Sequence, residues 1–484
     1  MRRPGYLVAS GALAVHALGS QPVPGVLLMQ FEEKRNPNAP SLRRRAEQTV
    51  EEVITNEKQR GGYFSTCTVG TPPQDIVLLL DSGSSDTWVP AINAPICSLS
   101  FSLDPCPLGS YDPDSSRTHS EFIRNALEIN YLDQSYVKGD YFRDVLGIGE
   151  SELANFTIGL GLNTSLSHGV IGVGYAINEA SVNTADLVYD NLPVALARSN
   201  ITSTSAYSLY LNDLGSPMGS ILFGGVDTEK YVGDMMKVKI KSQTLSSGEE
   251  IFDHFRIDLT SVEAESPSGT DTLTTESFPV DVILDSGTTL TSLPIDMVEQ
   301  MWEEAGAEFS SVLRQPLIPC YRRDSPGKFT FGFGGPGGPK ITVPMDELVL
   351  DLTTGKAPLF PDGSRYKGQE ACLFGIQDFG GPPYILGGTF LRSAYVVFDL
   401  VNNEIGIAQT DFNETDSSIV AFASNGSSIP SATEAPNQGQ TDTPARLVAP
   451  AYDARTGFQN SAWVPGVFGA STVLAVAVAF WAVL

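Results

Sequence analysis

Histidine and cysteine are scarce in this chain, with four and five residues among 484. They form no group with the spacing of metal ligands, so the sequence predicts no metal site and no cofactor. Because the number of cysteines is odd, at least one of them has no intramolecular disulfide partner. Sustained helical periodicity is equally rare, and residues 295–305 are a short candidate helix.

Basic side chains are also few. The chain has 30 Lys and Arg against 56 Asp and Glu, and residues 61–484 alone carry a net charge of −29. A surface of this sign repels nucleic acid and anionic membranes and attracts cationic peptides. It also repels itself less at acid pH, where carboxylates take up protons. Simple solubility would explain the same composition, so the charge argues against a nucleic-acid partner without choosing a function.

What the chain does contain favours short strands. Its 46 glycines and 32 prolines indicate many turns. Residues 65–69, 76–80 and 282–284 have the composition of strands, the last two as continuous apolar runs. A chain of this length predicts two domains or one large bilobed unit. We therefore expect a mainly β protein.

The N-terminus has the pattern of a secretory signal peptide. Two arginines precede an apolar run from Tyr6 to Leu18, which is too short to span a membrane. We assign residues 1–19 to this signal, with a helix of the mature protein as the alternative. Residues 20–60 then form a pro-segment with three basic clusters where a proprotein convertase can cut: 34–35, 43–45 and 58–60. We favour Arg43-Arg44-Arg45, although such clusters are also common on ordinary surfaces.

The C-terminal part predicts a surface anchor. Residues 411–460 are rich in Ser, Thr and Pro, so we expect an extended stalk that buries no core. The segment 461–484 is apolar from Val464 to its end, and the final basic residue is Arg455. This pattern fits a signal that is exchanged for glycosylphosphatidylinositol (GPI) at the plasma membrane or cell wall, attached near Gly457 or at Asn460-Ser461-Ala462. A retained tail anchor is the alternative.

Secretion permits disulfides and N-linked glycans. Five Asn-X-Ser/Thr sequons occur, and with a signal peptide they are credible glycosylation sites. They lie at Asn155, Asn163, Asn200, Asn413 and Asn425. We expect a monomeric glycoprotein.

A faint internal repeat divides the chain. Ile76–Leu80 leads into Asp81-Ser82-Gly83-Ser84, and about 200 residues later 282–284 leads into Asp285-Ser286-Gly287-Thr288. Each half later contains two apolar residues followed by glycine, at 170–172 and 385–387. Two copies of this pattern imply two related lobes, which we place at 61–215 and 216–410.

Asp81 and Asp285 suit peptide hydrolysis. Two carboxyl groups held close together cannot both ionise, so one stays protonated while the other is charged. The ionised group takes a proton from a water between them, the protonated group polarises the scissile carbonyl, and the pair titrates as a unit. The hydroxyls of Ser84 and Thr288 can hydrogen-bond the two carboxylates. A pair of ordinary turns is the alternative, yet buried Asp residues without a purpose are uncommon.

Four segments carry a family resemblance. Asp81–Pro90, Asp285–Pro294, Tyr384–Phe390 and Val397-Phe398-Asp399 resemble the pepsin family, over about Gly62 to Gln409. The resemblance implies a bilobed fold with the cleft between the lobes, one catalytic Asp from each lobe, and an endopeptidase that cuts polypeptides at acid pH. A cleft that binds peptides without cutting them and a two-carboxylate glycosidase are the alternatives.

The resemblance to the pepsin family also implies a flap. Ile129–Tyr131 and Gly139–Tyr141 resemble the hairpin that closes over substrate, with Tyr131 at the flap tyrosine and Trp88 supporting it. Core packing is the alternative for both aromatics. The tip departs from the family, because Leu132 and Gln134 replace glycines. Asp133 resembles a fungal feature that favours Lys or Arg in the substrate.

Within the family the chain looks most like fungal yapsins. The pointers are residues 206–211, residues 219–227, the GPI-type tail and an insertion that holds two cysteines. By this resemblance the disulfides are Cys97–Cys106 and Cys320–Cys372. Cys67 then lies outside both, as a buried small hydrophobic residue.

Overall fold

The computed structural model of the chain describes residues 24–30, 51–52, 54–57, 62–98, 105–149, 151–216, 219–353, 356–442 and 450–459. The predicted signal peptide, the three basic clusters and residues 461–484 lie outside these residues. None of the helices in the described part is long and apolar enough to cross a bilayer.

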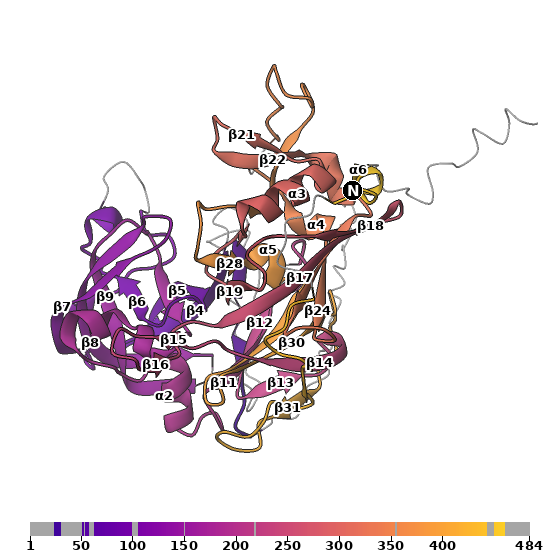
Figure 1. Cartoon of the computed structure of the whole chain (residues 1–484). Helices are drawn as coiled ribbons and strands as arrows, with labels where there is room; N and C mark the ends of the chain where they lie inside the picture. The colour runs from indigo at the N-terminus through magenta and orange to yellow at the C-terminus, as the bar shows by residue number, and fades with distance from the viewer. Residues whose placement is uncertain are drawn as a thin grey trace, which may run out of the picture.

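The N-terminal lobe is built on one sheet of eight strands, drawn to the left in Figure 1. Its core strand β5 contains the apolar run at 76–80, and three side chains of that run are buried. The strand order is β3 (Ile54–Glu57), β4 (Gly62–Val69), β5 (Gln74–Asp81), β10 (Gly169–Gly172), β6 (Thr87–Pro90), β9 (Ser151–Thr164), β8 (Tyr136–Ile148) and β7 (Ser120–Asn130).

The C-terminal lobe repeats this plan with a larger sheet and a small four-stranded sheet. The larger sheet runs β24 (Lys340–Pro344), β23 (Lys328–Phe333), β17 (Arg256–Ser266), β19 (Val280–Leu284), β28 (Tyr384–Leu386), β20 (Thr291–Ser292) and β27 (Ile376–Gln377), with β18 (Gly269–Leu273) beside β17. The small sheet runs β21 (Glu308–Ser310), β22 (Gln315–Pro319), β26 (Ala371–Phe374) and β25 (Val349–Leu350).

A third sheet of eight strands takes strands from each half of the chain and is called the shared sheet below. Leu27, from the predicted pro-segment, is buried in it. Its order is β2 (Glu51–Glu52), β1 (Leu27–Gln30), β12 (Ser220–Phe223), β11 (Ala206–Tyr210), β29 (Ala394–Asp399), β30 (Glu404–Thr410), β14 (Tyr231–Lys239) and β32 (Thr433–Glu434). A smaller pair, β15 (Gln243–Thr244) and β16 (Glu250–Ile251), lies outside it.

Helices are short. The predicted helix at 295–305 is confirmed as α3 (Ile295–Ala305), which ends at Gly306 in the left-handed conformation that favours glycine. The others are α1 (Ala180–Ala185), α2 (Leu192–Arg198), α4 (Met345–Leu348), α5 (Gly388–Leu391) and α6 (Arg455–Gln459).

The internal repeat is visible in the strand pairing. β5, which ends at Asp81, pairs in parallel with β10, and β19, which precedes Asp285, pairs in parallel with β28. Each aspartate therefore follows the same two-strand unit in its own lobe. The mainly β, bilobed architecture is as predicted.

The predicted stalk is wrong for the residues that the structure describes there, 411–442 and 450–459. β31 (Ile419–Ala421) pairs with β13 (Gly225–Asp227), and β32 pairs with β14. Phe422 and Ile429 are buried in a cluster with strands of the shared sheet. A few spaced apolar side chains are enough to hold this segment because the body supplies the rest of the surface that they bury.

Candidate active site

Asp81 and Asp285 lie on facing loops with matching environments. Both are buried, with 6% and 8% of their surface exposed. The Gly83 N–H and the Ser84 hydroxyl donate to the two oxygens of Asp81. In the same way Gly287 N–H (2.8 Å) and Thr288 Oγ1 (2.6 Å) donate to Asp285. Each lobe thus presents one carboxyl group with both of its oxygens already hydrogen-bonded.

Ser82 and Ser286 tie the two loops together. Ser82 Oγ donates to the carbonyl oxygen of Leu284 (3.1 Å) and accepts from the backbone N–H of Ser286 (2.9 Å). Ser286 Oγ returns both bonds, donating to Leu80 O (3.0 Å) and accepting from Ser82 N–H (3.1 Å). All four bonds are buried. They fix one aspartate relative to the other.

Glycine is required in both motifs because each glycine lies very close to the aspartate of the other lobe. A Cβ added at Gly83 would lie 2.6 Å from Cγ of Asp285, and one added at Gly287 would lie 2.4 Å from Oδ1 of Asp81. Real Cβ atoms do not come this close to other heavy atoms. The Ser-Gly sequence therefore allows each carboxyl group to reach the loop of the other lobe.

The environment of Asp81 raises its pKa. The pKa of Asp81 is raised above its ordinary value, first because burial disfavours the charged form and then because the Asp285 carboxylate lies beside it. Hydrogen bonds from Ser84 and Gly83 oppose this shift without cancelling it. The surroundings of Asp81 therefore favour the protonated form of its carboxyl group.

The flap hairpin consists of β7, β8 and the turn between them. Trp88 is fully buried, and its Nε1 donates to the hydroxyl of Tyr131 at 2.8 Å. Asp133 is exposed at the tip, where its Oδ1 accepts from the backbone and hydroxyl of Ser135 (2.9 and 2.6 Å). Leu132 exposes 68% of its surface. The structure thus brings Trp88 and Tyr131 together and leaves the Asp133 side chain accessible.

One part of the site was missed by the sequence analysis. Asp86, inside the first motif, is buried and accepts from the hydroxyls of Tyr141 (2.5 Å) and Tyr189 (2.8 Å) and from the backbone of Ala180 (2.8 Å). Burial raises the pKa of Asp86. The signal that could have found it was an aspartate directly before the buried strand β6. Through these bonds Asp86 links the loop that follows Asp81 to β8 and α1.

A cavity of about 530 Å³ lies between the lobes, close to the candidate site. Its lining includes Tyr63, Asp213, Ser286, Asp346 and Arg392. Neither Asp81, Asp285 nor Tyr131 lines it. The case for a reactive centre therefore rests on the facing aspartates and the flap rather than on this cavity.

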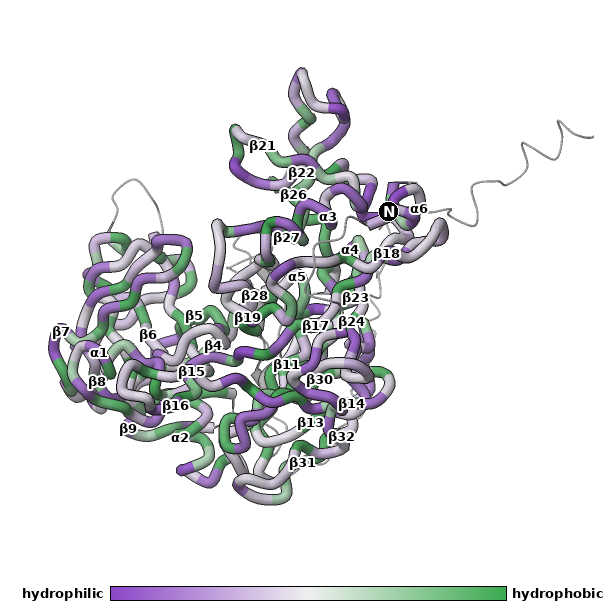
Figure 2. The backbone as a smooth tube through the Cα atoms, in the orientation of Figure 1, coloured by the Kyte–Doolittle hydropathy of each residue, from purple (hydrophilic) through white to green (hydrophobic). Residues whose placement is uncertain are grey.

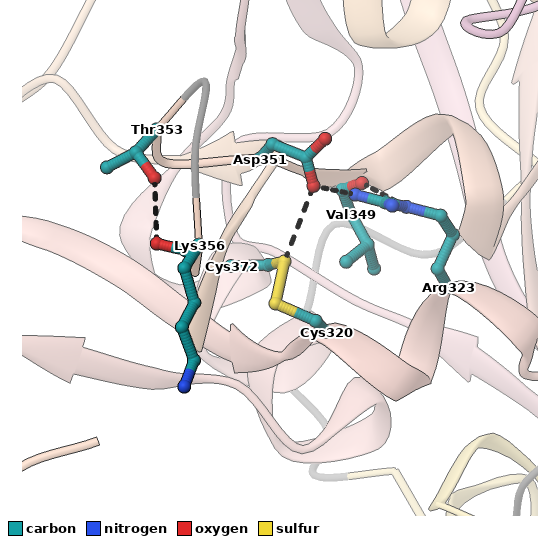
Figure 3. The surroundings of a disulfide bond; sticks show 7 residues. All are labelled: Cys320, Arg323, Val349, Asp351, Thr353, Lys356 and Cys372. Atoms are coloured by element: carbon teal, nitrogen blue, oxygen red, sulfur yellow. Dashed lines mark hydrogen bonds and ion pairs between the residues drawn. A yellow bond between two sulfur atoms is a disulfide. The ribbon is translucent and has the colours of Figure 1, made fainter. Parts of the chain in front are cut away.

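The disulfides join Cys97 to Cys106 and Cys320 to Cys372, as predicted. The second links the end of β22 to β26, and Asp351 lies beside it, held by Arg323 at 2.6 Å (Figure 3). Cys67 is buried in β4 and lies outside both disulfides. The five sequon asparagines are all exposed, so the fold leaves each of them open to modification.

Known proteins are similar to this chain in sequence and fold. The sequence model described as "Eukaryotic aspartyl protease" matches residues 62–410. The chain is 40% identical over 400 residues to "Probable aspartic-type endopeptidase opsB" of Aspergillus oryzae, covering 82% of this chain and 78% of that protein. It is 30% identical over 419 residues to "Aspartic proteinase yapsin-3" of Saccharomyces cerevisiae, covering 85% and 77%.

A solved structure agrees on the fold. The aspartic proteinase from Irpex lacteus superposes with a TM-score of 0.56 at 20% identity, covering 75% of this chain and 98% of that one. Together with the sequence matches, this settles the family, and the chain belongs to the eukaryotic aspartyl proteases as an aspartic-type endopeptidase.

Proposed function

We propose that Asp81 and Asp285 are the catalytic dyad and hold the attacking water between them. The observation that carries this proposal is the pair of matching carboxyl groups on facing loops, each with its own hydroxyl and backbone donor. The ionised carboxylate takes a proton from water as the oxygen attacks the scissile carbonyl. The protonated carboxyl donates to the carbonyl oxygen. The tetrahedral diol then collapses: one carboxyl group protonates the departing amine as the C–N bond breaks, the other takes a proton from a hydroxyl of the diol as the carbonyl re-forms, and the dyad ends with one proton as it began.

An acid optimum follows from the dyad. Activity falls at low pH when the base becomes protonated, and it falls at high pH when the acid loses its proton. The raised pKa of Asp81 moves the upper limit towards neutrality. We therefore expect an optimum at about pH 4–6, with an alkaline limb that reports the upper apparent pKa of the coupled pair.

Tyr131 closes the flap over an extended peptide, and Trp88 holds its hydroxyl in place. A preference for Lys or Arg near the cleavage site is supported by the exposed Asp133 at the flap tip and by the net charge of −29 over residues 61–484. Exposed acidic groups attract cationic substrates and raise their association rate at low ionic strength.

Peptide-library cleavage across pH tests these roles. Asp81→Asn and Asp285→Asn should each abolish turnover, because either change removes the shared proton site. Asp133→Asn is the matched control, since it should reduce cleavage beside basic residues and spare turnover of neutral peptides. Full activity in either dyad variant would refute the mechanism. An unchanged preference in Asp133→Asn would refute the role of the flap carboxylate alone.

The chain also has the features of an anchored surface precursor. We include in the proposal secretion by the 1–19 signal, activation by a proprotein convertase near residue 45, glycans on the exposed sequons, a monomeric state and a GPI anchor. Docking of α6 favours attachment at 460–462 over Gly457, because Gly457 is buried and the carbonyl of Phe458 is hydrogen-bonded. Release from cells by phosphatidylinositol-specific phospholipase C tests the anchor, and retention after treatment would favour a tail anchor instead.

A further inference from the structure

The chain leaves the described body at a defined place. Phe458 in α6 is fully buried, and its carbonyl accepts from Arg322 Nη1 (3.1 Å) and Ser325 Oγ (2.7 Å). Side-chain atoms of the next residue, Gln459, come within 3.6 Å of a Cβ built at Gly306, the residue that ends α3. The described part of the chain therefore ends at Gln459, beside the C-terminal end of α3.

A hairpin with an exposed apolar tip begins at the same place. β21 starts two residues after Gly306 and pairs with β22. The ring of Phe309 stacks on Trp302 of α3 with centroids 5.9 Å apart. Beyond this support Phe309, Val312 and Leu313 expose 54%, 88% and 50% of their surface. In Figures 1 and 2 the β21–β22 hairpin and α6 both lie at the upper end of the C-terminal lobe, the hairpin to the left and α6 to the right.

The charge of this hairpin is unlike that of the rest of the chain. Between Glu308 at its base and Pro319 at its end, the hairpin has no further acidic residue and one basic residue, Arg314. Arg314 is exposed at the tip, and among the ion pairs of the described residues it takes part in none. Glu308, at the base, is paired with Arg365 at 3.8 Å. The tip is thus apolar and cationic on a strongly acidic protein, which suits a lipid interface.

The length of chain beyond α6 brings this tip close to lipid. Val464, where the apolar segment begins, lies five residues after Gln459. Five extended residues span at most about 17 Å. An anchor at 460–462 or a retained apolar tail would therefore hold the end of α3, and the hairpin that follows it, next to the bilayer surface.

We propose that the tip of the β21–β22 hairpin is a lipid-contacting surface, with Phe309, Val312 and Leu313 in the interface of the bilayer that carries the chain's own anchor. This inference rests on the anchoring part of the proposed function. The protein is then attached to the membrane at two places, the anchor and the hairpin tip. Two attachments fix the orientation of the catalytic body on the membrane.

A tethered reporter tests the contact directly. Residues 460–484 are replaced by a polyhistidine tag, which removes none of the contacts described above, and the protein is bound to vesicles of brominated phosphatidylcholine with a nickel-chelating lipid. Val312→Trp places a fluorophore at the tip. Val188→Trp is the matched control, because Val188 is 49% exposed on the N-terminal lobe. Background emission comes from Trp88 and Trp302 in both proteins.

We expect the bromolipid to quench Val312→Trp emission and shift it to the blue, while Val188→Trp stays unquenched. Without the tether, Val312→Ser/Leu313→Ser should bind vesicles about tenfold more weakly than the parent, and Ile92→Ser/Val188→Ser should match it. Equal quenching of the two reporters would overturn the proposal, as would dimerisation through the tip without quenching. Because the tether is artificial, failure here is distinct from failure of the GPI anchor, which phospholipase release reports.

Discussion

Removing the Ser82 hydroxyl, which links the two loops that carry Asp81 and Asp285, should strongly lower the stability of the protein. Ser82→Ala deletes a side chain that donates to Leu284 O and accepts from Ser286 N–H. Both partners are buried. Each buried polar group left unpaired costs about 1–3 kcal/mol. We therefore expect Ser82→Ala, which leaves two such groups unpaired, to lower the free energy of unfolding by about 2–6 kcal/mol.

Urea unfolding at pH 5, followed by tryptophan fluorescence, measures this loss. Ser286→Ala deletes the mirror-image pair of bonds and should cost a similar amount, which makes it an internal control. Turnover should fall in both variants because the loops no longer fix the separation of the aspartates. A change below about 0.5 kcal/mol, as for an ordinary surface substitution, would show that the crossed bonds do not hold the loops.

Three further predictions follow from single contacts. Tyr131→Phe leaves the buried Trp88 indole N–H unpaired, so kcat/KM should fall about tenfold and the unfolding free energy should fall by about 1–3 kcal/mol; unchanged peptide kinetics would contradict the role of this bond. Burial and the nearby Asp271 carboxylate raise the pKa of Glu304 to about 8, so stability should fall as pH rises from about 5 to 8, because the unfolded state ionises first. Glu304→Gln should remove most of this dependence, and Glu299→Gln, at an exposed position of the same helix, should keep it, as thermal melts across pH would show. Gln134→Gly should stabilise the flap by about 1 kcal/mol and speed its closure, because Gln134 has φ +70°; pre-steady-state peptide binding that is no faster would count against this strain.

The site was more predictable from the sequence than its surroundings. Asp81, Asp285 and the helix at 295–305 are each marked by residues adjacent in the chain, and local patterns report local structure well. The network around Asp86 depends on tyrosines 55 and 103 residues away. A single sequence carries no signal for such a meeting.

The prediction of an extended C-terminal stalk was wrong for a different reason. Composition measures how much apolar surface a segment can bury by itself, and residues 411–459 can bury little. It does not report what the rest of the protein offers. Phe458 packs on Phe329 at 4.9 Å, and Ala454 donates its backbone N–H to the buried Asp271 at 2.7 Å. A segment that cannot fold alone is therefore ordered by a surface that was already formed.

In the flap, two residues that replace glycines of the family pattern differ in their backbone conformation. Leu132 and Gln134 both stand where relatives of this fold are expected to have glycine, but only Gln134 has a positive φ. Three-residue hairpin loops place their last residue in the left-handed region, where glycine is favoured. The Gln134 N–H donates to Tyr131 O at 3.0 Å, and Tyr131 N–H donates to Ser135 O at 2.8 Å. These bonds hold Gln134 in its strained conformation, so the cost of the departure falls on Gln134. Leu132 needs no special backbone, and its exposed side chain is free to contact substrate.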